Sequence, residues 1–118
     1  MGAYSVEHVT AAGANLTMIN ITGSASVRIK LYEFILSSDA VPEDDATHFI
    51  IIRTSSVGTG GTALSEIPLD PLTVAATGAA VGGTFTGQPT LSQTAFHVAL
   101  NQRATFRWSA VPGSALIS

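Results

Sequence analysis

The sequence predicts an all-β fold, an antiparallel sandwich or barrel of six or seven short strands. Two long runs of β-type residues carry the prediction, residues 26–36 and residues 47–54, joined by an acidic loop. The remaining apolar runs are short, evenly spaced and separated by turn residues. No segment has the periodicity of a convincing amphipathic helix.

Two strands are expected before the first long run, at residues 4–10 and 16–22. The second is rich in β-branched residues, and residues 11–15 form a turn between the two. One face of the first strand carries Tyr4, Val6 and His8.

The run 26–36 alternates as a strand with one buried and one solvated face. Arg28 and Lys30 fall on the solvated parity, and the apolar parity consists of Val27, Ile29, Leu31 and Ile35. Glu33 is the one carboxylate on the apolar parity. We expect it to form a structural ion pair with an arginine such as Arg53 or Arg107.

The middle of the chain alternates between loops and strands. Residues 37–45 are polar, and their acidic cluster belongs at a solvated tip. Residues 49–52 are continuously apolar, as in a strand covered on both faces. Residues 57–62 are a flexible, glycine-rich break. Two prolines in the irregular segment 64–72 predict an edge strand or an extended crossing.

The last third contains two clear strands, residues 93–100 and 104–110, in which large apolar residues alternate. Before them, residues 73–87 are rich in alanine, but their glycines favour a loop. Residues 115–118 resemble the start of another strand. Their apolar end needs cover, either from a partner chain or from further residues.

The length of 118 residues predicts a single β-sandwich domain spanning 1–118. Such a chain buries roughly two-thirds of its unfolded surface. It has no cysteine, which excludes disulfides and thiolate–metal sites. No apolar run approaches the roughly 18 residues of a membrane span, and the N-terminus lacks the features of a secretory signal.

Charged residues make up only 11% of the chain, against about 25% in an ordinary domain. The net charge is −3, and the five basic residues are scattered, which argues against a nucleic-acid partner. A neutral surface rich in Thr and Ala suits contact with other protein, because burying a charge in an interface is costly.

No catalytic, cofactor or metal site is expected, so the chain is not predicted to be an enzyme. His8, His48 and His97 have no ligand at metal-site spacing and are interpreted as ordinary strand residues. The acidic cluster 43–45 lacks the alternating order of a calcium loop. No nucleophile elbow of the Gly-x-Ser-x-Gly type occurs.

Several segments together carry a resemblance to a known family. They are Val-Arg-Ile-Lys-Leu-Tyr-Glu-Phe-Ile-Leu-Ser-Ser at 27–38, Phe-Ile-Ile-Ile-Arg-Thr at 49–54, Gly-Thr-Gly-Gly-Thr at 58–62, Pro-Leu-Asp-Pro at 68–71, Phe-His-Val-Ala-Leu-Asn at 96–101 and Phe-Arg-Trp at 106–108. This order of segments resembles tailed-phage virion proteins with a jelly-roll fold, the capsid decoration or cement proteins. The likeness covers about two-thirds of the chain.

The resemblance implies a jelly-roll-like antiparallel β-sandwich without catalysis or cofactor. Proteins of this kind are usually homotrimers that clamp neighbouring subunits of the major capsid protein. Their place is the capsid surface of the virion, after synthesis in the host cytoplasm. Family members continue through further strands after the aromatic strand, whereas this sequence ends at Ser118. The sheet is therefore closed either within the chain or with the help of partner chains.

Intersubunit contacts are expected on the loop 55–62, on 73–87 and at the C-terminal end. The residues assigned to this interface are Val57, Thr59, Thr62, Val81, Phe85, Leu116 and Ile117. The alternative function is a carbohydrate- or receptor-binding module of a head fibre or tail accessory protein. That function predicts an exposed Trp108 or Tyr32 beside polar side chains.

Overall fold

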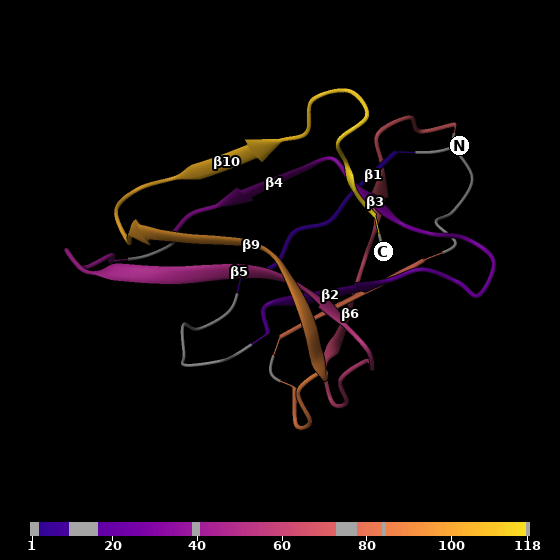
Figure 1. The fold of residues 1–118 in the computed structure, drawn as a ribbon, viewed down its shortest axis with the longest axis horizontal. Coiled ribbons are helices and arrows are strands. Elements are labelled where there is room, and N and C mark those ends of the chain that lie inside the picture. Colours follow the sequence, from indigo (N-terminus) through magenta and orange to yellow (C-terminus); the bar gives the residue numbers. More distant parts are fainter. Residues whose placement is uncertain (1–2, 10–16, 39–40, 73–77, 84, 118) are drawn as a thin grey trace. The chain divides into compact units, whose positions relative to one another are not determined.

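The computed structural model describes residues 3–9, 17–38, 41–72, 78–83 and 85–117. Within these residues the regular structure consists of eleven β-strands, without a helix (Figure 1). Every strand pair whose register is defined is antiparallel. The all-β, sandwich-type prediction is confirmed, while the finer jelly-roll topology stays a prediction.

The chain forms two compact units, each made of two segments. Unit 1 consists of Met1–Ile29 and Thr54–Thr90, and unit 2 consists of Lys30–Arg53 and Leu91–Ser118. Each unit has its own strand pairs. The organisation of 1–118 as a single domain stays a prediction.

Unit 1 contains a three-stranded sheet in the order β2-β8-β6 and a separate pair β1-β7. The bounds are β1 Tyr4–Ser5, β2 Ile19–Thr22, β6 Thr62–Leu64, β7 Ile67–Pro68 and β8 Ala79–Gly82. The expected alternation holds in the first segment, where Tyr4, Val6 and His8 are half-buried between exposed neighbours. The proline-containing β7 pairs with β1 alone, as expected of an edge strand. The turn predicted at 11–15 lies outside the described residues.

The central strand of this sheet, β8, was expected to be part of a loop, and over residues 79–82 that prediction is wrong. Alanine and glycine have low strand propensity, but here their small side chains let the sheet pack closely. A Cβ on Gly82 would lie 2.8 Å from Leu64 Cδ1 and 2.9 Å from His8 Cδ2. Ala80 is only 2% exposed, and its N–H donates to Glu66 Oε1 at 2.6 Å.

Phe85 is the largest buried side chain of unit 1, at 6% exposure. Glycines bring the loop 57–62 close to its ring, because a Cβ on Gly58 would lie 2.5 Å from Phe85 Cδ1. The backbone N–H of Thr59 donates to the carbonyl of Gly87 at 2.9 Å. The segment predicted as a flexible break is therefore a loop held by hydrogen bonds and by packing.

Unit 2 contains three strand pairs, β4-β10, β5-β9 and β3-β11. The bounds are β3 Lys30–Leu31, β4 Glu33–Leu36, β5 Ala46–Thr54, β9 Leu91–Asn101, β10 Phe106–Ser109 and β11 Leu116–Ile117. The pairs β4-β10 and β5-β9 form two layers, seen one above the other in Figure 1, and aromatic rings from both layers are in contact. The strands expected at 93–100 and 104–110 are confirmed as β9 and β10.

The strand expected over 26–36 is interrupted, and its predicted buried parity holds at Ile29 and Leu31 but is wrong at Val27, which is 44% exposed, and beyond Tyr32. Residues 24–27 form a tight turn, closed by the N–H of Val27 and the carbonyl of Ser24 at 3.3 Å. In β4, Phe34 is half-buried, whereas Ile35 is 59% exposed. The reason is that the Phe34 ring packs with other aromatic rings between the layers, which turns its neighbours outward.

The structure also corrects two predictions about which residues are covered by neighbouring parts of the chain. Ile50 in β5 is 48% exposed, so the apolar stretch 49–52 is not covered on both faces within this chain. The C-terminal residues do form a strand, β11, and its cover on one edge comes from β3 of the same chain. Ile117 remains 40% exposed.

Candidate functional surfaces

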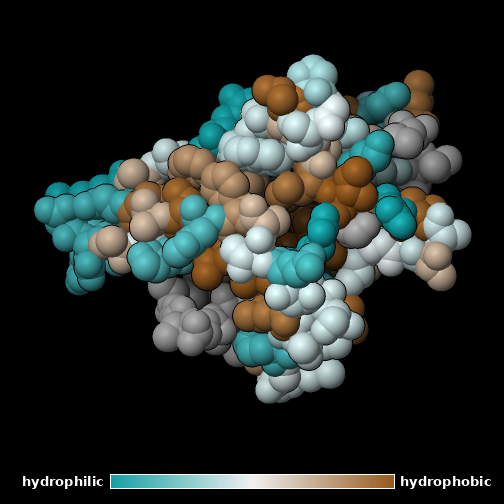
Figure 2. Space-filling view, in the orientation of Figure 1, coloured by the Kyte–Doolittle hydropathy of each residue, from teal (hydrophilic) through white to brown (hydrophobic). Residues whose placement is uncertain are grey.

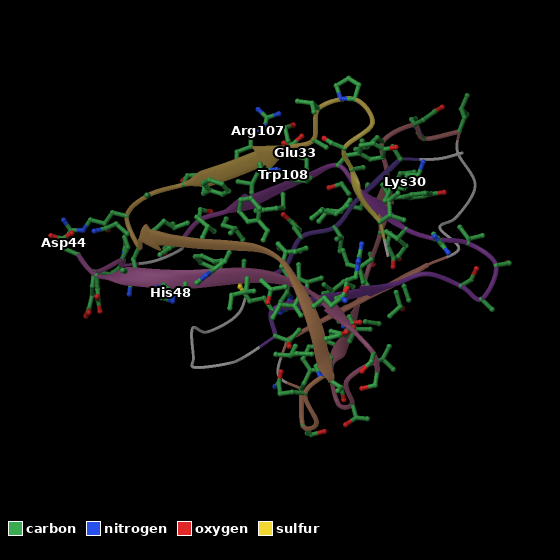
Figure 3. All side chains as sticks on the ribbon, viewed as in Figure 1. Lys30, Glu33, Asp44, His48, Arg107 and Trp108 are labelled. Carbon is green, nitrogen blue, oxygen red and sulfur yellow. The ribbon has the colours of Figure 1, made fainter. Side chains whose placement is uncertain are left out.

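The aromatic cluster of unit 2 is a packing core. Phe34 stacks on Trp108 with ring centroids 5.4 Å apart and 22° between planes, and meets Phe96 edge-on at 5.6 Å. Phe106 contacts both phenylalanines. All four rings are half-buried. Trp108 lies between the two layers (Figure 3), and its stacked face is already occupied by Phe34.

The outer face of β4-β10 carries one ion pair. Arg107 Nε donates to Glu33 Oε1 at 2.7 Å, with the side chains 64% and 39% exposed (Figure 3). Glu33 lies opposite Ser109 in the register, so the pair is a diagonal cross-strand contact. The structural pairing of Glu33 with Arg107 is confirmed. Its exposure limits its contribution to at most about 1 kcal/mol.

A shallow, half-open groove lies beside β3 and β11. It is lined by Lys30, Tyr32, Gly113, Ala115 and Ile117 and has a volume of about 80 Å³. Sites that enclose drug-sized ligands span about 300–1,000 Å³ and are more closed. Tyr32 is 55% exposed there. The groove offers an aromatic face, but it does not enclose a ligand.

The acidic loop before β5 is part of a hydrogen-bond network with the β9–β10 turn. Asn101 Nδ2 donates to Asp44 Oδ1, and the N–H of Glu43 donates to Gln102 Oε1 at 3.1 Å. The N–H of Gln102 donates in turn to the carbonyl of Asp45. In the described part of the chain, no group of three or more metal-ligating side chains occurs. The hydrogen bonds therefore fix residues 43–45 against the β9–β10 turn.

Two histidines that are distant in sequence meet on the strand pair β5-β9. The rings of His48 and His97 have centroids 5.2 Å apart and lie at 79° to each other. Both residues are exposed. His48 stands near the start of β5, next to the loop that contains Asp44 (Figure 3). The spacing of histidines along the sequence missed this pair, because it arises from strand pairing.

The third histidine, His8, lies apart in unit 1. It is half-buried against Gly82, and its Nε2 atom is buried without a hydrogen-bond partner in the described structure. Among the described residues it belongs to no group of three or more metal-ligating side chains. The expected strand-face position of His8 is wrong, because β1 ends at Ser5 and His8 packs against Gly82 from outside the strands.

The residues assigned to an intersubunit interface occupy different environments. Val57, Thr59 and Thr62 are exposed on one loop and the start of β6, and Ile117 is exposed at the C-terminal strand. Val81 and Leu116 are half-buried, while Phe85 belongs to the core of unit 1. The interface stays a prediction, and its accessible members are Val57, Thr59, Thr62 and Ile117.

Large hydrophobic side chains reach the surface throughout the described chain (Figure 2). Those that are clearly exposed are Val9, Ile21, Val27, Tyr32, Ile35, Val41, Ile50, Val57, Ile67, Leu69, Leu72, Leu91, Val111 and Ile117. Among the described residues, Ala80 and Phe85 form the buried hydrophobic core, with Pro89 also buried, and all three lie in unit 1. Hydrophilic residues gather at the tip that contains Asp44 (Figures 2 and 3).

Comparisons of the chain with protein-family models, curated proteins and solved structures gave no match. A helix long and apolar enough to cross a membrane does not occur in the part of the chain that the structure describes.

Proposed function

We propose that this chain is a non-enzymatic virion structural protein, a decoration or cement subunit that binds and stabilises an assembled major-capsid lattice. The observation that carries the proposal is the set of large hydrophobic side chains left exposed. Fourteen of the described residues belong to it, and thirteen of these are aliphatic.

Exposed hydrophobic side chains of this kind are what permanent assemblies cover. Obligate interfaces cover about 2,000 Å² or more in total, and they are more hydrophobic than transient ones. Charged residues, which are costly to bury in such an interface, make up only 11% of the chain. In unit 2, none of the described residues is buried. These features support a chain that completes its hydrophobic contacts against other protein.

The resemblance of the sequence to tailed-phage decoration proteins supports the capsid lattice as that other protein. A subunit that binds the assembled lattice and not the free capsid protein stabilises the shell by mass action. Symmetry-related chains, expected as a homotrimer, multiply weak contacts through avidity. The low charge and the exposed loop around Val57 suit such a role.

The test is co-sedimentation of the purified chain with empty shells assembled from the major capsid protein of the same virus. We expect the chain to pellet with shells and to remain in the supernatant with unassembled capsid protein. Equal binding to both forms, or no binding to shells, would contradict the proposal.

A second function, carbohydrate or receptor binding in a head fibre or tail accessory protein, is favoured by one observation. Tyr32 is exposed in a groove beside Lys30, an arrangement that suits stacking of a sugar ring. Titration with a glycan panel, followed by the NMR signals of Tyr32, tests this function. Binding that is lost in Tyr32→Ala would support it, and unchanged signals would remove it.

A further inference from the structure

The pair of exposed imidazoles on β5-β9 carries an inference that is independent of the proposed function. We propose that His48 and His97 form a two-imidazole binding site for a divalent transition metal such as Zn²⁺, Ni²⁺ or Cu²⁺. The two rings are in direct contact, with centroids 5.2 Å apart, and they belong to neighbouring paired strands.

The geometry is compatible with shared coordination of one ion. Metal–imidazole bonds are about 2.0–2.1 Å long, so two coordinating rings must come as close as these two already are. The planes lie at 79° to each other, so the rings are not stacked face to face. Small rotations about the side-chain bonds would then direct one nitrogen of each ring to a common point. Water completes the coordination, as in open metal sites.

The surroundings leave room for an ion and its water molecules. Ala95 and Ala99 lie two residues either side of His97, and therefore on the same face of β9. Both are exposed, and their methyl groups are too short to cover the imidazoles. Imidazole is a preferred ligand of Zn²⁺, Ni²⁺ and Cu²⁺, whereas Mg²⁺ and Ca²⁺ prefer oxygen. The site is therefore selective for transition metals.

Occupancy would have a structural consequence. An ion held by His48 and His97 links β5 to β9, the two strands that form one layer of unit 2. None of the described residues in this unit is buried, so the unit has little core of its own. A ligand that binds only the folded chain stabilises it by mass action. Metal is therefore expected to raise the melting temperature.

The test is calorimetric titration of the full chain with ZnCl₂ and, separately, NiCl₂ at neutral pH. We expect one ion per chain. Affinity should fall at least about tenfold in His48→Ala and in His97→Ala, because one imidazole remains instead of two. The control variants His8→Gln and Asp44→Asn should bind as the unaltered chain does, since neither residue contributes to the pair.

Two further measurements keep the result independent of any folding defect in the variants. Zn²⁺ should shift the imidazole nitrogen signals of His48 and His97 in the unaltered chain, and leave those of His8 in place. Saturating Zn²⁺ should also raise the melting temperature by about 5 °C or more. The proposal is overturned if the unaltered chain binds no more tightly than His48→Ala/His97→Ala, or if the shifted signals lie elsewhere.

Discussion

At the scale of single residues, close packing in this protein depends on positions where a side chain would not fit. Gly58 is the clearest case. A Cβ there would lie 2.5 Å from the Phe85 ring, 2.8 Å from the carbonyl oxygen of Gly87 and 2.9 Å from Pro89 Cδ. The backbone oxygen cannot rotate away as a flexible side chain can. The core around Phe85 therefore requires glycine at this position.

Gly58→Ala is accordingly expected to destabilise the chain by about 1–3 kcal/mol, the cost of overpacking a well-filled site. The adjacent Val57 is 63% exposed, and Val57→Ala should change stability by less than about 0.5 kcal/mol. Urea unfolding followed by circular dichroism measures both. Similar stability of the two variants would show that the loop does not pack on Phe85.

The Glu33–Arg107 pair illustrates the opposite case, a visible contact with little expected energy. Both side chains are substantially exposed, so water screens the attraction. A double-mutant cycle with Glu33→Gln and Arg107→Gln should give a coupling of at most about 1 kcal/mol, decreasing with added salt. A larger coupling that persists in high salt would mean that the pair is buried in solution, for example under a partner chain.

At the scale of elements, the aromatic cluster holds the two layers of unit 2 together. Phe34 on β4 contacts Phe96 on β9 and Trp108 on β10, so it joins strands from both layers. Because these contacts need the even-numbered face of β4, Ile35 on the other face is left exposed. The orientation of β4 is thus decided by ring packing and not by aliphatic alternation.

Phe34→Ala should therefore cost about 2–4 kcal/mol, toward the lower end of large-to-small substitutions because the ring is half-buried. Ile35→Ala, one residue further along, should cost less than about 1 kcal/mol, since Ile35 is 59% exposed. Thermal and urea unfolding compare the two. A larger loss at Ile35 would reverse the inferred orientation of β4.

The elements that could be predicted from the sequence are those whose pattern agrees with their final environment. The strands β9 and β10 alternate clearly, and they form where expected. The strand β8 could not be predicted, because residues 79–82 are small and acquire their strand from neighbours on both sides. The parity of β4 was missed since Phe34 and Ile35 are both apolar, and only tertiary contacts decide between them.

Candidate sites, too, can be predicted from the sequence only where they do not depend on which strands become neighbours. Pairing of Glu33 with an arginine could be expected from its charge, although the buried parity assigned to Glu33 is wrong. The meeting of His48 and His97 could not, because it depends on which strands become neighbours. Local spacing contains no information about that choice.

At the scale of the whole molecule, the feature that matters most is the exposed hydrophobic surface, which contact with other protein would bury. Among the described residues, fourteen large hydrophobic side chains are exposed and none in unit 2 is buried, which is a poor balance for an isolated chain. Association with further copies and with a capsid lattice would remove that surface from water. The exposed hydrophobic side chains support the proposed assembly role, and the capsid lattice as partner is the part of the proposal that rests on the resemblance of the sequence.

Self-association can be tested by sedimentation velocity. We expect the chain to sediment as a trimer, and Val57→Asp to shift it toward monomer, because burying a carboxylate in an apolar contact is costly. Ser92→Asp, an exposed change on β9 outside the assigned contacts, serves as the matched control and should leave the trimer intact. A trimer unaffected by Val57→Asp would show that the loop 55–62 is not the contact.

The central claim is that the chain is a lattice-wide decoration subunit of a virion. The most direct measurement is the copy number of the chain in purified particles of the proposed source virus, by quantitative mass spectrometry against the major capsid protein. The account predicts a copy number comparable with that of the major capsid protein, as lattice-wide decoration requires. A few copies per particle would instead indicate a tail, portal or fibre component. Either that result or absence of the chain from particles would contradict a decoration role.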